Sequence, residues 1–203
     1  QELCGVLAEH PGAVIVAGLT DVGLWINKQL ASIDTLVYLG RVAGLRDIVE
    51  RDGYLEIGAA ATYSDAIEVF GQHWPQLRPY MARIGAVQVR NAGTVGGNIA
   101  NGSPIGDMAP PLIALGARLV LTGAAGSRSL DVEDFYIEYG RQDLRPGEFL
   151  EKIRVPLPRD GQLYGAYKLS KRVEQDISAV SAAFLLELED GRVRRARLCY
   201  GGM

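Results

Sequence analysis

Glycine, amide-bearing and small polar residues are concentrated at residues 85–123, ahead of a stretch of apolar residues. Eight glycines fall in this segment, and glycine at such density indicates backbone that takes positive φ or approaches another group closely. Backbone N–H groups in a loop of this kind bind the pyrophosphate of a cofactor, so phosphates are expected near residues 94–103. The side chains that add hydrogen-bond donors and acceptors around the loop are Asn98, Asn101, Ser103 and Asp107.

The alternative is a tight glycine-rich connection that binds nothing, which an isolated Gly-Gly pair would favour. The polar side chains gathered around these glycines favour the cofactor interpretation instead. Residues 108–115 predict a helix directly after the loop, and its N-terminal dipole would add to the attraction of a phosphate. Asp107 is expected to cap that helix, to bind ribose-type hydroxyls, or to do both.

A second turn that suits a phosphate follows residues 13–18, a continuously apolar run that includes β-branched residues. Such a run predicts a short strand buried on both faces. Thr20 or Asp21 is expected to cap the next helix, over residues 21–30. A flanking helix and a second strand complete a small α/β unit with parallel pairing: residues 2–10 and 35–40.

The rest of the chain alternates predicted hairpins and helices. The pairs Asp52-Gly53 and Asp190-Gly191 each separate two strand-like runs, which is the signal for a two-residue hairpin turn. Two further helices and three further strands are expected, in chain order, at residues 62–71, 75–83, 117–123, 127–135 and 149–156.

Composition argues against several classes of protein. The formal net charge of −3 and the pI near 5.5 argue against nucleic-acid binding, because the short basic run at residues 192–197 reads as the solvated face of a strand. The two cysteines lie at opposite ends of the chain, and with only two histidines no metal or iron–sulfur site can be assembled from this chain alone. The cysteines, Cys4 and Cys199, are expected to be small buried hydrophobic residues.

The sequence also bears on location. No positively charged leader with an apolar core opens the chain, and no apolar run reaches about twenty residues, so neither export nor membrane insertion is expected. A cytoplasmic location is the default expectation. The chain opens within a predicted helix and stops after a strand, which favours a fragment of a longer polypeptide.

Familiar cofactor and catalytic motifs are missing. The dinucleotide fingerprint G-x-G-x-x-G, the phosphate loop and the G-x-S-x-G elbow do not occur, so an ordinary Rossmann, P-loop or serine-hydrolase protein is not expected. Lys168 is either a cation near a reduced, anionic ring system or a surface lysine on a strand. Glu174 and Asp176, beside Lys171 and Arg172, favour a salt-bridged face over a pair for proton transfer.

Several runs of residues resemble one known family. They include VIVAGLTDVG at residues 14–23, RNAGTVGGNIANGSPIGDMAP at residues 90–110, and the closing CYGGM at residues 199–203. With GEFLEKIRVP and YGAYKLSKR, they resemble the FAD-binding domain, or small subunit, of the molybdenum hydroxylases. The resemblance covers nearly the full chain and is closest to the xanthine dehydrogenase branch.

The resemblance implies an α+β chain with the vanillyl-alcohol-oxidase, or PCMH-type, FAD-binding fold. Residues 1–60 would form a first FAD-binding subdomain, a small α/β unit with parallel strands. Residues 61–160 would form a second, mixed α+β subdomain that carries the glycine-rich loop, and residues 161–203 the beginning of a C-terminal α+β domain. FAD would lie extended between the two subdomains.

The resemblance also implies which residues contact FAD. Ile84 stands where the family often has an aromatic residue beside the flavin, so a packing role is expected there. Leu150 and Lys168 match positions near the adenine and the isoalloxazine, respectively. The implied cofactor-binding residues are Val14, Ile15, Val16, Ala17, Gly18, Leu19, Thr20, Asp21, Ile84, Thr94, Val95, Gly96, Gly97, Asn98, Ser103, Asp107, Leu150 and Lys168. No side chain of this chain is expected to be catalytic or to bind a metal.

The chemistry implied for the family divides between several domains. A molybdopterin cofactor oxidises hypoxanthine or xanthine toward urate, [2Fe–2S] clusters pass the electrons on, and FAD delivers a hydride to NAD+. This chain would therefore bind FAD, with the other centres in partner domains or subunits of a dimeric complex. The alternatives are the FAD subunit of a relative acting on carbon monoxide, an aldehyde or a heteroaromatic compound, and a docking domain that has lost the flavin.

Overall fold

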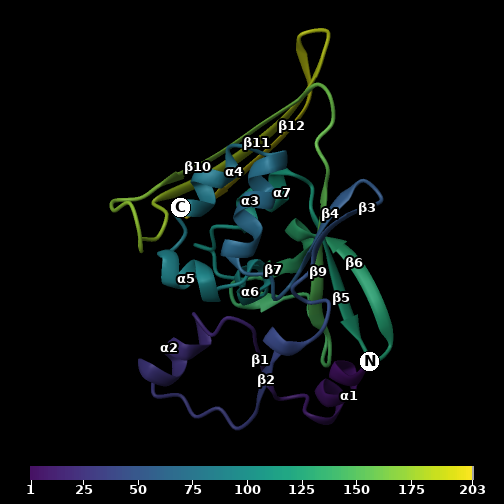
Figure 1. Ribbon diagram of the computed structural model, residues 1–203, viewed down its shortest axis with the longest axis vertical. Coiled ribbons are helices and arrows are strands. Elements are labelled where there is room, and N and C mark those ends of the chain that lie inside the picture. The colour runs from purple at the N-terminus through teal and green to yellow at the C-terminus, as the bar shows by residue number, and fades with distance from the viewer. Residues whose placement is uncertain (203) are drawn as a thin grey trace.

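Three of the four β-sheets in the described residues follow one another along the length of the molecule (Figure 1). The computed structural model describes residues 1–202, so Met203, the last residue of CYGGM, lies outside the described residues. The chain begins at the lower, two-stranded sheet, builds a five-stranded sheet covered by helices, and ends in a long three-stranded sheet. None of the helices within residues 1–202 is both long enough and apolar enough to cross a membrane.

The first sheet pairs β1 (Val14–Val16) with β2 (Leu36–Tyr38) in parallel, which confirms the predicted pairing. Val14 and Ile15 are only partly buried, so the expectation of burial on both faces is wrong, because one side of this strand lines a cleft described below. The accompanying helices are α1 (Glu2–Glu9), α2 (Val22–Asn27) and the 3-10 turn η1 (Leu39–Arg41).

The second sheet is antiparallel, in the order β3-β4-β9-β5-β6. Asp52 and Gly53 join its first two strands with φ of 51° and 78°, the left-handed values that a type I′ hairpin turn needs. The strand expected at residues 127–135 ends early, and a 3-10 turn follows it. The elements of this sheet are β3 (Ile48–Arg51), β4 (Tyr54–Gly58), β5 (Arg118–Gly123), β6 (Gly126–Asp131) and β9 (Phe149–Pro156). Between β6 and β9 lie η2 (Val132–Phe135) and a separate two-stranded antiparallel sheet of β7 (Tyr136–Glu138) and β8 (Arg141–Gln142).

The β3–β4 hairpin belongs to this second sheet, since β4 pairs with β9. It lies within residues 1–60, the range expected for the first subdomain. Strand pairing therefore favours a division between the two subdomains before Ile48 rather than at residue 60.

Five helices pack on the second sheet or beside it. Thr62 caps the first of them, because its hydroxyl accepts from the Asp65 N–H at 3.0 Å while the Asp65 carboxylate accepts from the Thr62 N–H at 3.1 Å. Phe70, Leu77 and Leu112 are fully buried in the core between helices and sheet. The helices are α3 (Tyr63–His73), α4 (Leu77–Ala82), α5 (Val87–Ala92), α6 (Val95–Asn101) and α7 (Ala109–Ala114).

The glycine-rich segment is helical where an open loop was expected near residues 94–103. Of its eight glycines, only Gly85, Gly102 and Gly116 have positive φ. Gly96 lies inside α6, where an added Cβ would stand 2.5 Å from the Cα of Ala59. Close approach of two backbones, rather than unusual φ, is therefore the reason for glycine here.

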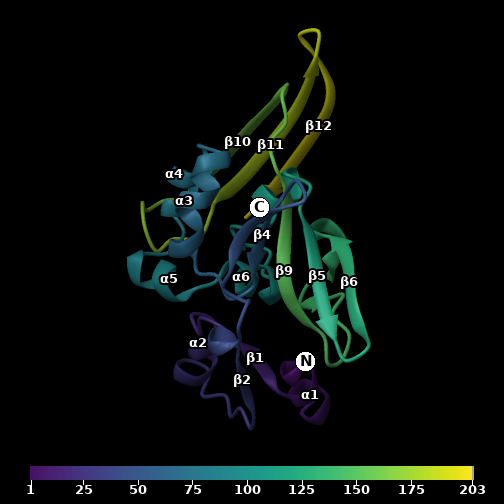
Figure 2. The same ribbon diagram turned by 45° about the vertical axis from the view of Figure 1, so that its right-hand side comes forward.

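The third sheet is antiparallel, in the order β10-β11-β12, and extends away from the rest of the molecule (Figure 2). Asp190 and Gly191 form its hairpin turn with φ of 49° and 73°, as predicted. Helix α7 packs against the second and third of its strands. The strands are β10 (Gln162–Leu169), β11 (Val180–Glu189) and β12 (Arg192–Gly201).

The basic run at residues 192–197 is exposed, as predicted, except at Arg197, which is partly buried. The Arg197 guanidinium donates to the Ile113 carbonyl at 2.8 and 3.0 Å and pairs with Glu133. Cys4 and Cys199 are unbridged, and both are only partly buried.

Candidate functional site

A cleft of about 770 Å³ runs between the first sheet and the glycine-rich helix α6. Cofactor and ligand pockets have volumes of about 300–1,000 Å³. One wall is the chain from Ala13 to Val22, the opposite wall is α6 with the turn that follows it, and a loop near residue 142 borders the same space. The cleft thus lies between the two turns that the sequence marked for phosphates.

Most of the residues expected to contact FAD line this cleft. Val95, Asp107 and Lys168 do not line it, since Val95 faces the core and the other two form a buried ion pair behind the cleft. The expected residues that do line it are Val14, Ile15, Val16, Ala17, Gly18, Leu19, Thr20, Asp21, Ile84, Thr94, Gly96, Gly97, Asn98, Ser103 and Leu150.

The first wall holds a strained residue. Leu19 has φ of 59° and is 44% exposed, and a left-handed conformation at a leucine costs about 1 kcal/mol. Gly18, just before it, packs on the end of α5, where an added Cβ would overlap the Ala92 carbonyl. Asp21 is the N-cap residue of α2, although its side chain makes no capping hydrogen bond. This turn is therefore held against α5 by backbone contact.

The second wall offers polar groups from the start of α6. Thr94 caps the helix, with its hydroxyl accepting from the Gly97 N–H at 3.0 Å. The Asn98 side-chain oxygen accepts from the Met108 N–H at 3.0 Å, so its amide N–H groups remain available to a ligand in the cleft. Ser103 also lines the wall. Helix α7 begins at Ala109, three residues after Gly106, which lines this wall, so the contribution of its N-terminal dipole to phosphate binding stays a prediction.

The remaining lining is apolar or very small. Ala17, Gly18, Ala59 and Gly96 place little or no side chain in the cleft, while Phe149 and Leu150 supply apolar surface. An extended cofactor with a charged middle and planar ends needs this combination of accessible backbone and apolar walls. The residues present therefore fit FAD.

Lys168 and Asp107 form a buried ion pair of 2.8 Å behind the cleft. The lysine side chain is fully buried and that of Asp107 is 11% exposed, so the surface-lysine alternative is wrong. The Lys168 ammonium also donates to the Ser178 hydroxyl at 2.8 Å, and that hydroxyl donates to Asp107 at 2.6 Å. Met108 is the N-cap residue of α7, so Asp107 does not cap that helix.

The acidic residues after Lys168 are salt-bridged, as the sequence favoured. Glu174 pairs with Arg90 at 3.6 Å, and Asp176 pairs with Arg172 at 3.5 Å. A hydrogen bond from the Arg172 backbone N–H holds the pKa of Asp176 below its ordinary value. Arg90 also donates to the Ile84 carbonyl at 3.1 Å, which links this loop to the cleft wall.

Several cleft residues were missed in the sequence. Tyr63 is the first residue of α3 and directly follows the capping threonine, a position that the T-x-x-D pattern marks. Gly140, Gln142 and Leu144 lie in or beside the short strand β8, which no local signal predicted. The other missed lining residues are Ala13, Val22, Trp25, Leu39, Ala59, Val89, Ala100, Ile105, Gly106 and Phe149, while Asn101, noted in the sequence as a polar side chain of the glycine-rich segment, also lines the cleft.

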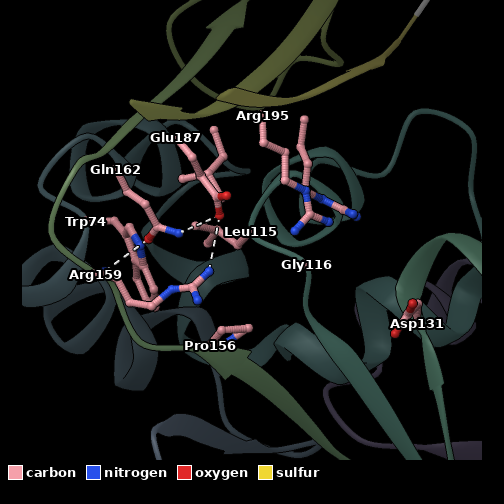
Figure 3. A pocket seen from close by; sticks show the side chains of 11 residues that line it. Trp74, Leu115, Gly116, Asp131, Pro156, Arg159, Gln162, Glu187 and Arg195 are labelled. Atoms are coloured by element: carbon pink, nitrogen blue, oxygen red, sulfur yellow. Dashed lines mark hydrogen bonds and ion pairs between the residues drawn. The ribbon is translucent and has the colours of Figure 1, made fainter. Parts of the chain in front are cut away.

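A second, smaller cavity of about 190 Å³ lies under the C-terminal sheet (Figure 3). Glu187 accepts hydrogen bonds there from Arg159 and Gln162, both at 3.1 Å. None of the residues expected to contact a cofactor lines this cavity. The larger cleft is therefore the candidate site.

Comparison with known families decides what kind of cleft this is. Residues 1–158 match the family described as the FAD binding domain in molybdopterin dehydrogenase. The chain belongs to this family. Residues 165–203 match the CO dehydrogenase flavoprotein C-terminal domain. Both matches confirm the resemblance that the sequence motifs carried.

Individual relatives agree with the family. The chain is 31% identical to the xanthine dehydrogenase FAD-binding subunit of Escherichia coli O157:H7, over 97% of this chain and 68% of that subunit. It is also 31% identical to the xanthine dehydrogenase of Emericella nidulans, over all of this chain and 16% of that protein. The chain thus spans about one-sixth of the length of such long xanthine dehydrogenases.

Solved structures share the fold. CO dehydrogenase from Oligotropha carboxidovorans superposes with a TM-score of 0.90 at 30% identity, covering 98% of this chain and 70% of that one. Quinoline 2-oxidoreductase from Pseudomonas putida 86 gives 0.88 at 30% identity, with coverages of 99% and 70%. These neighbours confirm the predicted α+β, PCMH-type FAD-binding fold.

Proposed function

We propose that this chain is the flavin domain of a xanthine dehydrogenase, and that electrons pass from the enzyme to the final acceptor through the flavin of this domain. The cleft between the first sheet and α6 is the observation that carries the proposal, because its lining suits an extended dinucleotide. The xanthine dehydrogenase relatives, similar over nearly the whole of this chain, support the choice of parent enzyme.

FAD is proposed to lie between the two walls. The backbone N–H groups of Gly18 and Thr20 on one side, and of Gly96 on the other, would bind its pyrophosphate. Ile84 and Leu150 would pack against its planar ends. When bound, FAD would supply a carrier that accepts electrons from iron–sulfur clusters and gives up a hydride to NAD+.

The chain's own residues bind and orient in this proposal, and none is assigned a catalytic role. Asn98 would donate from its amide N–H groups to FAD, while Phe149 and Leu150 would exclude water from the apolar side of the cleft. Asp107 and Lys168 would act behind the cleft, as a fixed ion pair that holds the turn leading to Gly106.

Partners follow from the same reasoning. The iron–sulfur clusters and the molybdopterin are proposed to lie in other domains or subunits, since this sequence has only two cysteines. NAD+ is the proposed acceptor, and the complete enzyme is proposed to be a cytoplasmic dimer.

A second candidate is the flavin subunit of a related molybdenum hydroxylase. It is favoured by the structural neighbours, which act on carbon monoxide and quinoline by their names. Assays of the assembled enzyme with xanthine, carbon monoxide and quinoline separate the two candidates. NADH formation with xanthine alone is the result expected for the first, and turnover of carbon monoxide or quinoline without xanthine turnover would overturn it.

A further inference from the structure

Arg128 holds two acidic residues of a distant loop. The arginine lies on β6, an edge strand of the second sheet. Its Nε and Nη2 donate to the two oxygens of the Glu148 carboxylate, both at 2.9 Å. Its Nη1 donates to the Asp143 carboxylate at 2.8 Å, and Nη2 donates to the Asp143 carbonyl at 2.7 Å. One guanidinium therefore fixes two points of the same loop.

The segment of residues 139–148, which includes β8, is called the strap here. Three of its residues, Gly140, Gln142 and Leu144, line the cleft, whereas Arg128 does not. At its tip, the Gln142 side-chain amide donates to the Asn101 carbonyl at 3.2 Å, at the end of α6. The strap thus reaches from the second sheet to the wall that carries Asn98.

The negative charges of Asp143 and Glu148 make the position of the strap depend on Arg128. The Glu148 side chain is 12% exposed and that of Arg128 is 23% exposed, so their hydrogen bonds are partly shielded from water. Arg145 faces the same carboxylates, and its backbone N–H donates to Glu148 at 2.9 Å. Without the Arg128 guanidinium, Asp143 and Glu148 would lose their charge-assisted hydrogen bonds, and Arg145 would offset only part of the repulsion between the two carboxylates.

We propose that Arg128 is a positioning residue for FAD: it holds the strap against the cleft and so slows the departure of the bound cofactor. The proposal rests on the function proposed above. Ordering a loop in its binding conformation lowers the entropic cost of binding, and such effects are expressed mainly in the dissociation rate.

The test compares two arginine variants in the flavin-loaded, complete protein. R128M removes the guanidinium from the strap. R118M is the matched control, because Arg118 lies on the neighbouring strand β5, pairs with Asp131 at 3.1 Å and does not touch the strap. The rate of FAD release is followed by the rise in flavin fluorescence on dilution, together with the unfolding midpoint of each apoprotein.

R128M is expected to release FAD about tenfold faster than the wild type, and R118M within about twofold of it. Q142A, at the strap tip, is expected to speed release as well, since it alters the same loop without touching Arg128. If R128M does not fold, E148Q removes the partner charge and is expected to act in the same direction. If R128M released FAD at the same rate as R118M, the role of Arg128 would be overturned. Where R128M does not fold, the same comparison is made between E148Q and R118M.

The wild type separates this result from failure of the proposed function. A wild-type protein that binds no FAD would overturn both proposals before any variant is made. If the wild type binds FAD but R128M releases it at the same rate as R118M, the role of Arg128 is overturned and the proposed function stands.

Discussion

The ammonium of Lys168 and the carboxylate of Asp107, 61 residues apart in sequence, form a buried ion pair of 2.8 Å. Lys168 lies on β10 of the third sheet, and Asp107 lies in the turn before α7. A second buried link joins the same regions, because the Tyr80 hydroxyl contacts Ser181 at 2.6 Å and donates to the Asp107 carbonyl at 2.5 Å. These polar contacts fix the third sheet on the helices of the second.

Replacing Lys168 by methionine is expected to lower the free energy of unfolding by about 3 kcal/mol, because it leaves the Asp107 carboxylate buried without its charge partner. Denaturant titration measures the loss. The control is R78M, which breaks an exposed pair with Glu68, at 62% and 60% exposure, and should cost less than about 1 kcal/mol. Equal losses in the two variants would contradict a special role for the buried pair.

Gly96→Ala is expected to destabilise the protein by about 1–3 kcal/mol, since the new Cβ would meet backbone atoms of Ala59 at 2.5 Å. It should also weaken FAD binding, because α6 must shift and carries a wall of the cleft. Gly5→Ala is the matched control: it lies in helix α1 with nothing within 4 Å of the added Cβ. That change should leave stability equal or raise it by up to about 1 kcal/mol. Unfolding midpoints measure the stability of the two variants, and FAD titration measures their affinity. Equal stability and equal FAD affinity in G96A and G5A would contradict the prediction.

Thr62→Ala is expected to cost about 1 kcal/mol, through loss of the hydrogen bond that caps α3. Thr62→Ser keeps the hydroxyl and should retain most of the stability. Thermal unfolding of the two variants side by side measures the difference. A serine variant as unstable as the alanine variant would mean that the capping bond contributes little.

Acid should loosen the strap. The hydrogen bonds from Arg128 hold the pKa of Glu148 below its ordinary value, so this carboxylate stabilises the folded protein above about pH 4.3. The stabilisation is lost as pH falls through the lowered folded pKa. FAD release measured from pH 6 to pH 3 should therefore accelerate more in the wild type than in E148Q, whose amide does not titrate. Parallel pH profiles would contradict this assignment.

Local signals account for the elements that the sequence predicted correctly. The Asp52-Gly53 and Asp190-Gly191 turns need left-handed φ at both positions, and such residue pairs supply it at low cost within two residues. The capped start of α3 is equally local, since Thr62 and Asp65 lie three residues apart. No tertiary knowledge is needed to place these elements.

Helix α6 was missed because its glycines oppose helix formation by propensity. Gly96 and Gly97 each disfavour a helix by about 1 kcal/mol relative to alanine, so an open loop is the natural reading. What overrides propensity is the close packing of Gly96 on Ala59, the residue that directly follows β4. Gly96 and Gly97 both line the cleft, and their contact with FAD stays a prediction.

Contacts between residues far apart in sequence explain the features that local patterns did not predict. The burial of Lys168 depends on Asp107 and Ser178, which come from different elements. The strap residue Gln142 bonds Asn101 at the cleft wall, and Arg128 from β6 bonds Asp143 beside it. No spacing within either segment encodes those contacts, so a reading of local patterns does not reveal them.

The most direct test of the account is release and identification of the flavin from the purified parent protein, after its visible absorption spectrum has been recorded. The account predicts one FAD per copy of this chain, together with iron–sulfur absorbance from the partner domains. An assembled protein with iron–sulfur absorbance but no flavin would contradict it, and would make this chain a docking domain.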